Sequence, residues 1–100
     1  MTHSVLKRAL DTWGEQAQML MVVEEMSELI KEVLKNVNRK KDNLAQIVEE
    51  TADVEIMLEQ LKENYHIAEK VEAYKAQKIK EIEKRLNDWD KKIAADMRKE

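Results

Sequence analysis

Two pairs of acidic residues stand at helical spacing in this chain. The first pair is Glu25 and Glu28, and the second is Glu50 and Asp53, with 21 residues between Glu28 and Glu50. Residues three apart on a helix share a face, so each pair directs two carboxylates the same way. Two antiparallel helices would bring the pairs together, and a cation would have to offset their repulsion. The pattern therefore predicts a divalent metal site with oxygen ligands, and phosphate chemistry is the leading interpretation.

The surroundings of the two pairs differ from those of an ordinary solvated helix face. No Lys or Arg lies within four positions of Glu50 or Asp53, whereas Lys31 and Lys35 follow the first pair. On a helical wheel each pair lies on the flank of an apolar stripe, where a solvated face would more often mix Glu with Lys. One such pair alone is more simply explained as solvated surface. Two pairs on neighbouring helices favour a site for Mg²⁺, with Mn²⁺ or Ca²⁺ as other ions that oxygen ligands suit.

Composition places the chain in the class of small helical domains. Its 100 residues contain no Pro, one Gly and no Cys, with 39% charged and 43% hydrophobic residues. The lack of helix breakers and the abundance of Glu, Lys, Leu and Met predict an all-α fold in a single domain, residues 1–100. A net charge of -3 without a strongly basic patch argues against a nucleic-acid polymer as partner. No apolar run is long enough to span a membrane, and the lack of Cys fits a cytoplasmic protein.

Apolar periodicity divides the chain into a short N-terminal helix and three long helices. The short helix should follow Ser4 as its N-cap and end near Gly14, and the long helices should cover about residues 15–37, 43–62 and 67–100. Asp42 is the expected cap of the third helix, after a loop at residues 36–41. Short connections make the long helices antiparallel neighbours in a bundle. Because this bundle has a thin core, we expect oligomerisation with a second copy to complete it.

The two acidic elements resemble those of a known enzyme family. In order and spacing they are similar to the E-x-x-E and E-x-x-D elements of the MazG-like, all-α nucleoside triphosphate pyrophosphohydrolases. Glu25 and Glu28 match the first element, and Glu50 and Asp53 match the second, within the segment Glu49–Val54. Each element is weak evidence alone, and the two together are fairly specific.

The resemblance extends over most of the chain and implies an activity. The segment Trp13–Met19 and the basic residues Lys75 and Lys78 also resemble family positions, so the likeness covers about residues 13–86. It implies Mg²⁺-dependent hydrolysis between the α- and β-phosphates of a nucleotide, giving a nucleoside monophosphate and pyrophosphate. It also implies assembly into homodimers or homotetramers.

Several residues are candidates for work on such a substrate. Glu25, as a carboxylate not saturated by metal, is the favoured base for the attacking water. Lys75 and Lys78 are expected to offset charge on the leaving pyrophosphate, unless they belong to a solvated face. Trp13 is a candidate for stacking on the base, and Gln18 for a base edge or a phosphate; a core position is the alternative for Trp13.

A non-enzymatic role is the alternative reading of the sequence. Apolar residues near the C-terminus recur at alternating spacings of three and four, like a coiled-coil seam: Ile79, Ile82, Leu86, Trp89 and Ile93. Such a seam would suit a helical interaction module that pairs with a partner helix. The string Glu63–His66 is an E-x-x-H element of the kind that di-iron bundles use, but it occurs once and at an expected helix end. A solvated turn is its simpler explanation.

Overall fold

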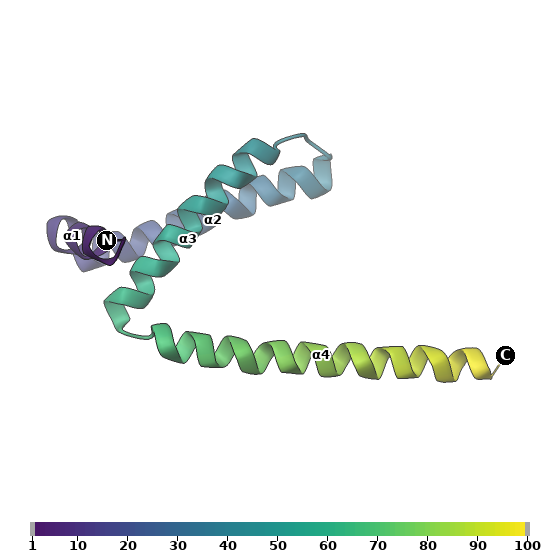
Figure 1. Cartoon of the computed structure of the whole chain (residues 1–100). Helices are drawn as coiled ribbons and strands as arrows, with labels where there is room; N and C mark the ends of the chain where they lie inside the picture. Colours follow the sequence, from purple (N-terminus) through teal and green to yellow (C-terminus); the bar gives the residue numbers. More distant parts are fainter. Residues whose placement is uncertain (1, 100) are drawn as a thin grey trace. The chain divides into compact units, whose positions relative to one another are not determined.

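The fold consists of four α-helices joined by short connections (Figure 1). The computed structural model describes the backbone of residues 2–99 and the side chains of residues 4–99. The helices are α1 (Thr2–Trp13), α2 (Glu15–Arg39), α3 (Leu44–Tyr65) and α4 (Ala68–Arg98). The predicted all-α class, with a short N-terminal helix before three long ones, is confirmed.

The chain divides into two compact units between α3 and α4. The first unit ends at His66 and contains α1, α2 and α3, and the second begins at Ile67 and contains α4. Within the first unit α2 packs chiefly against α3, and α1 contacts both. The predicted pairing of the second and third helices is therefore present. The place of α4 in a bundle and the single domain over residues 1–100 stay predictions.

Residues with positive φ separate the helices in a chain that has no proline. Gly14 lies between α1 and α2 at φ +94°, a conformation that glycine adopts without steric cost. Lys40 ends α2 at φ 51°, and His66 ends α3 at φ 54°. Residues with a Cβ adopt this left-handed region at a cost of about 1–2 kcal/mol. The Lys40 N–H bonds to the Lys35 carbonyl, and the His66 N–H bonds to the Glu63 carbonyl, so these turns satisfy backbone groups at the helix ends.

Four predicted helix boundaries were wrong, one of them the end of α3, which runs to Tyr65 rather than to about residue 62. Ser4 lies inside α1 rather than before it, because no helix breaker precedes it and the helix begins at Thr2. The α2 helix runs on to Arg39, so most of the loop expected at residues 36–41 is helical. Asn43, and not Asp42, directly precedes α3, and its side chain makes no capping bond to that helix. The Asn43 side chain bonds back to α2 instead, which shifts the connection toward residues 40–43.

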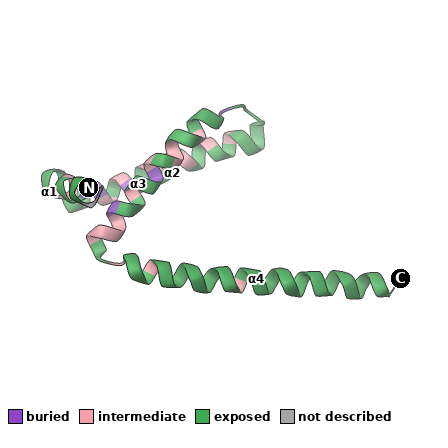
Figure 2. Cartoon of the chain, viewed as in Figure 1, coloured by how far each residue is buried: buried purple, intermediate pink, exposed green. Residues whose placement is uncertain are grey.

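A narrow core holds α1, α2 and α3 together, and few residues are buried in it (Figure 2). Val22 on α2 is 4% exposed and Val54 on α3 is 8% exposed, so these two valines supply buried apolar surface on the facing helices. Gln60 of α3 is fully buried, and its Nε2 donates a hydrogen bond of 3.1 Å to the Leu6 carbonyl of α1. The side-chain amide thereby fixes the short helix to the α2–α3 pair.

Large apolar side chains remain exposed on all four helices. On α2 they form a stripe that does not face α3: Leu20, Val23, Met26, Ile30, Val33, Leu34 and Val37. Exposed apolar surface of this extent favours assembly with further chains, as the sequence led us to expect. In the part of the chain that the structure describes, every helix is too short or too polar to cross a membrane.

Replacement of Lys40 by glycine should stabilise the protein. Lys40→Gly removes the steric cost of φ 51° at the end of α2, so we expect the free energy of unfolding to rise by about 0.5–1 kcal/mol. Urea denaturation followed by circular dichroism measures the change. The matched control is Lys31→Gly, inside α2, where glycine should lower stability by about 1 kcal/mol. Equal losses in both variants would show that Lys40 does not hold the left-handed turn.

Candidate metal centre

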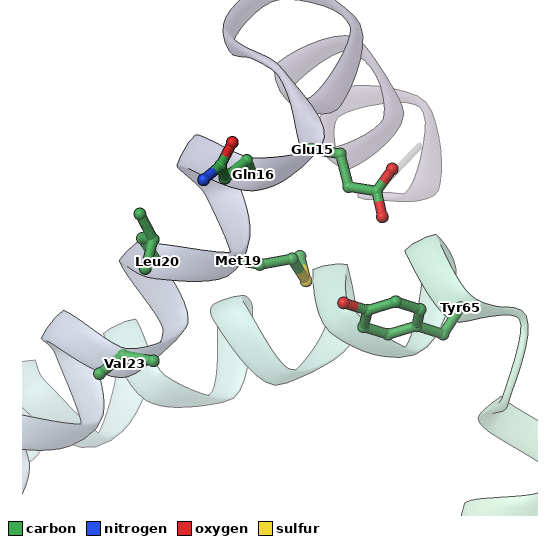
Figure 3. A pocket seen from close by; sticks show the side chains of 6 residues that line it. All are labelled: Glu15, Gln16, Met19, Leu20, Val23 and Tyr65. Atoms are coloured by element: carbon green, nitrogen blue, oxygen red, sulfur yellow. The ribbon is translucent and has the colours of Figure 1, made fainter.

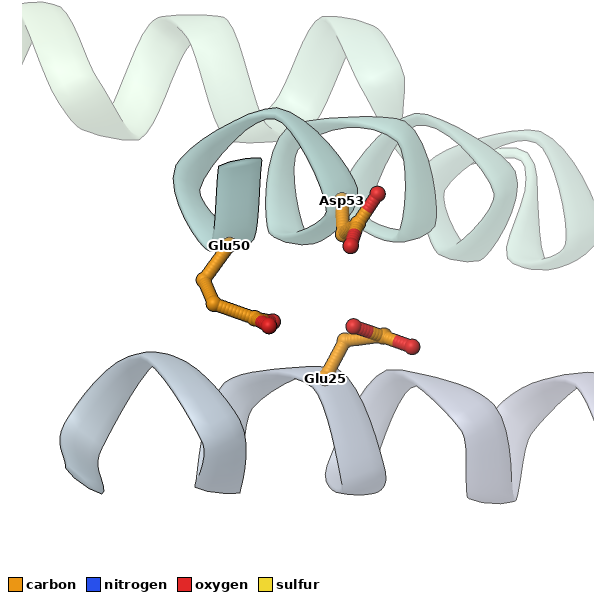
Figure 4. A group of neighbouring side chains, drawn as sticks. All are labelled: Glu25, Glu50 and Asp53. Carbon is orange, nitrogen blue, oxygen red and sulfur yellow. The ribbon is translucent and has the colours of Figure 1, made fainter. Parts of the chain in front are cut away.

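Three carboxylates meet between α2 and α3. Figure 4 shows Glu25 of α2 facing Glu50 and Asp53 of α3. One oxygen from each side chain lies within 4.8 Å of the oxygens from the other two, and all three residues are half-buried. In the described part of the chain, no Lys or Arg forms an ion pair with any of them. The structure thus brings together three of the four carboxylates that the sequence selected, and we call them the acidic triad.

Apolar packing places the acidic triad at the helix contact. Glu25 follows Val22 by about one turn on α2, and Glu50 precedes Val54 by about one turn on α3. Both valines are buried, so the helix faces that carry them must approach each other. The carboxylates on these faces are then carried into a partly desolvated space. Mutual repulsion of like charges opposes the arrangement, and apolar burial on either side offsets it.

A second polar contact fixes how α2 and α3 align. Asn43, only 3% exposed, donates from Nδ2 to the Glu32 carbonyl at 2.9 Å and to Glu32 Oε2 at 2.7 Å. Glu32 follows Glu25 by seven residues, and Asn43 precedes Glu50 by seven. Seven residues span two helical turns, or about 10.5 Å along each axis. The contact between Asn43 and Glu32 therefore sets the register in which Glu25 meets Glu50.

The pKa values of two triad residues reflect this environment. Burial raises the pKa of Glu25, and the neighbouring charge of Asp53 raises it further. Burial also raises the pKa of Glu50, and the charge of Glu25 raises it further. A side-chain hydrogen bond between the two carboxyls adds to the rise in the pKa of Glu50 and opposes the rise in the pKa of Glu25. The raised pKa values of Glu25 and Glu50 therefore reflect the cost of holding like charges together in a partly desolvated space.

The residues present fit a hard divalent cation. All donors are carboxylate oxygens, which suit Mg²⁺ and Mn²⁺. Glu50 Oε2 is buried and has no hydrogen-bond partner among the described residues. This oxygen is therefore available to bind a metal ion. Two oxygens on one Mg²⁺ lie no more than about 4.2 Å apart, so small side-chain rotations would suffice to close the present spacing around an ion.

Glu28 and the two N-terminal candidates lie in different surroundings. Glu28 is exposed and outside the acidic triad, although its charge adds to the raised pKa of both Glu25 and Glu50. Trp13 is 66% exposed at the end of α1, so it is not a core residue. Gln18 is 7% exposed and lies two turns before Glu25 on the buried face of α2. Roles for these residues in catalysis, metal binding or substrate binding stay predictions.

Lys75 and Lys78 belong to α4 and so to the second unit. Lys75 forms an ion pair of 3.3 Å with Glu72, and Lys78 forms one of 3.3 Å with Glu81. Lys78 also lies over the ring of Tyr74, with 5.3 Å between Nζ and the ring centroid. All of these contacts are within one exposed helix surface. The expected role of both lysines in binding pyrophosphate stays a prediction.

The E-x-x-H element proves to be the end of a helix. His66 is exposed in the left-handed conformation that ends α3. In the described side chains, the acidic group close enough to share a metal ion consists of Glu25, Glu50 and Asp53, without His66. The solvated turn expected at Glu63–His66 is therefore limited to His66, because α3 runs on to Tyr65.

One surface pocket was not anticipated from the sequence. It measures about 560 Å³ and lies where the start of α2 meets the end of α3. Its lining is Glu15, Gln16, Met19, Leu20, Val23 and Tyr65 (Figure 3). Val23 and Glu25 are two residues apart on one helix and therefore point to nearly opposite sides. The pocket opens away from the acidic triad, and only the exposed tyrosine near a helix end hinted at it.

The comparisons with known proteins add no relative. No family model, no curated protein and no solved structure matches this chain. The case for a metal centre therefore depends on the geometry and electrostatics of the acidic triad.

The pH dependence of stability should report the triad directly. The pKa of Glu50 is raised from its ordinary value of 4.5, so the folded state binds protons more tightly than the unfolded state. The metal-free protein should therefore lose this part of its stability as pH rises from about 4.5 through the raised pKa. Glu50→Gln should remove the loss and be more stable than the wild type above that window. Urea denaturation at a series of pH values, in the presence of a chelator, measures the difference.

The matched control for this titration is Glu55→Gln. Glu55 lies on the exposed side of α3, outside the acidic triad, so its replacement should leave the pH profile unchanged. Glu32 acts in the opposite direction, because the hydrogen bond from Asn43 lowers its pKa and its contribution is lost as pH falls. For that reason the difference between variant and wild type is the informative quantity. A Glu50→Gln profile parallel to that of the wild type would contradict the account.

Proposed function

We propose that this protein is a Mg²⁺-dependent nucleoside triphosphate pyrophosphohydrolase of the MazG-like type. The observation that carries the proposal is the acidic triad: three carboxylate oxygens from two helices lie within 4.8 Å of one another, with no cationic partner among the side chains of residues 4–99. A protein that needed this cluster only for stability would pair it with Lys or Arg. The resemblance of its acidic elements to those of the family supports the same function.

The proposed reaction adds water across the bond between the α- and β-phosphates. The water oxygen bonds to the α-phosphorus, the bond to the bridging oxygen breaks, and the products are a nucleoside monophosphate and pyrophosphate. Bound at the triad, Mg²⁺ or Mn²⁺ would neutralise phosphate charge and orient the α-phosphate. Glu25, Glu50 and Asp53 would hold the ion, and Glu28 would join from the adjacent turn.

The chain's own groups would supply proton transfer and binding. Glu25 is our candidate to take the proton from the attacking water, because its carboxylate points into the partly desolvated space. For the leaving pyrophosphate we assign Lys75 and Lys78 as cationic contacts. Trp13, which is exposed, is available to stack on a base, and Gln18 is the candidate amide for a polar substrate group. The enzyme would act as a homodimer or homotetramer.

A non-enzymatic interaction module is the alternative function. The exposed apolar seam of α4 favours it, because a helix with such a seam is suited to pairing. The two functions respond differently to mutation. Loss of triad carboxylates should abolish hydrolysis in an enzyme but should matter little to an interaction module. For the module, Leu86→Asp and Trp89→Asp should prevent assembly.

Release of pyrophosphate from a panel of nucleoside triphosphates tests the proposed activity. With Mg²⁺ present, we expect the wild type to release pyrophosphate from at least one of them. Glu50→Gln and Asp53→Asn should each lower the rate of pyrophosphate release more strongly than changes to residues that only support metal ligands. Such supporting changes typically cost about 10–100-fold. Glu55→Gln on the exposed side of α3 should keep wild-type activity. Inactivity of the wild type on the whole panel, or wild-type rates in both triad variants, would overturn the proposal.

Binding of Mg²⁺ should also be visible without turnover. A ligand that binds only the folded state stabilises it by about 2.7 kcal/mol at 100 times its Kd. We therefore expect added Mg²⁺ to raise the Tm of the wild type and to leave that of Glu50→Gln nearly unchanged. Differential scanning calorimetry at constant ionic strength measures both. Equal shifts in the two proteins would assign the effect to general screening and not to the triad.

A further inference from the structure

The exposed face of α4 has the heptad pattern of a coiled coil. Its apolar residues occupy successive a and d positions: Ile79 (a), Ile82 (d), Leu86 (a), Trp89 (d) and Ile93 (a). All five side chains are exposed, and the unit that contains α4 begins at Ile67, so this seam has no cover in the single chain's own unit. A partner helix would cover this seam. The charged residues on either side of the seam indicate which helix that partner is.

The two flanks of the seam carry opposite charge. The g positions that precede the a residues are all basic: Lys78, Arg85 and Lys92. The e positions that follow the first two d residues are both acidic: Glu83 and Asp90. A helix with one basic and one acidic flank is complementary to a second copy of itself in only one direction.

The direction follows from the geometry of coiled coils. In a parallel pair, each g residue lies beside the e residue of the next heptad on the other helix. Lys78 would therefore meet Glu83 of the second copy, and Arg85 would meet Asp90, each contact occurring twice by symmetry. An antiparallel pair would instead set g against g and e against e, so like charges would face one another. We propose that α4 of this protein pairs with α4 of a second copy as a parallel, in-register coiled coil.

The local contacts of α4 agree with this pairing. Lys84, on the outer face of α4, forms an ion pair of 3.0 Å with Asp88, and Lys78 on the basic flank forms one of 3.3 Å with Glu81. By contrast, Glu83, Arg85 and Asp90 form no ion pair or hydrogen bond with any described residue. Lys92 lies along the seam, with its Nζ 5.7 Å from the centroid of the Trp89 ring. Glu83, Arg85 and Asp90 are thus free to pair across an interface, where Lys78 would exchange Glu81 for Glu83 of the second copy. The inference does not depend on the proposed hydrolase function.

Disulfide trapping in the full chain tests both partner and direction. Because the protein has no cysteine, single-cysteine variants give an unambiguous signal. In a parallel pair each seam residue faces itself, so Ile82→Cys and Ile93→Cys should each form a covalent dimer in a glutathione redox buffer. An antiparallel pair aligned over the same seam would place Ile82 opposite Ile93, so only a mixture of the two variants would cross-link. Non-reducing electrophoresis and mass spectrometry measure the products.

The controls separate the proposed pairing from chance collision. Lys84→Cys, on the outer face of α4, should remain monomeric under the same buffer. Reversal of the acidic flank by Glu83→Lys and Asp90→Lys should abolish cross-linking of Ile93→Cys, and addition of Lys78→Glu and Arg85→Glu should restore it. Cross-linking only in the mixture, equal cross-linking of Lys84→Cys, or insensitivity to charge reversal would each overturn the proposal. Cross-linking in either seam variant alone with the expected charge dependence supports it.

Discussion

Electrostatic repulsion among three carboxylates is the constraint around which the first unit is organised. Glu25, Glu50 and Asp53 approach within 4.8 Å with no basic partner in the described part of the chain, so the packing of α2 on α3 must offset the cost of holding them there. Buried Val22 and Val54 on the facing helices supply the apolar part of that packing. The raised pKa values of Glu25 and Glu50 record what remains uncompensated. A divalent cation would remove the same cost, which joins the stability of the fold to its proposed chemistry.

The α2–α3 connection keeps the acidic triad in register. Its turn begins at Lys40 in the left-handed conformation and is tied to α2 by the side chain of Asn43. Asn36 contributes from inside α2, with its Nδ2 donating to the Lys41 carbonyl and to Asn43 Oδ1. Such local bonds hold the two helices against sliding. A shift of one residue in the register of one helix would turn the side chains of that helix by about 100° about its axis and break up the triad.

The two units of the chain bury their apolar side chains to different extents. The first unit has a small core and an exposed apolar stripe along α2, whereas α4 has no buried residue in the part described. Both surfaces are typical of a protein that assembles. The charges along α4 add direction to that general tendency, because its basic and acidic flanks are complementary in a parallel pair. Assembly through α4 would use residues other than the carboxylates of α2 and α3.

Much of the architecture followed from composition and periodicity. Without proline and with a single glycine, helix was the expected state nearly everywhere, and Gly14 marked a true break. The boundaries were harder, because Lys40 and His66 adopt the left-handed conformation although neither residue type signals it. Asn43 was missed for a similar reason: its side chain bonds to Glu32, which is distant in sequence, rather than to its own helix.

The sequence by itself determined that Glu25, Glu28, Glu50 and Asp53 share helix faces, since three-residue spacing on a helix fixes direction. Only the tertiary structure decided which of them meet. The rotation of α2 against α3 depends on which residues bury most favourably, and this choice brings Glu25 toward Glu50 and Asp53 while Glu28 stays exposed. Helical periodicity is a local property of the chain, whereas the distance between two helices' side chains depends on long-range packing.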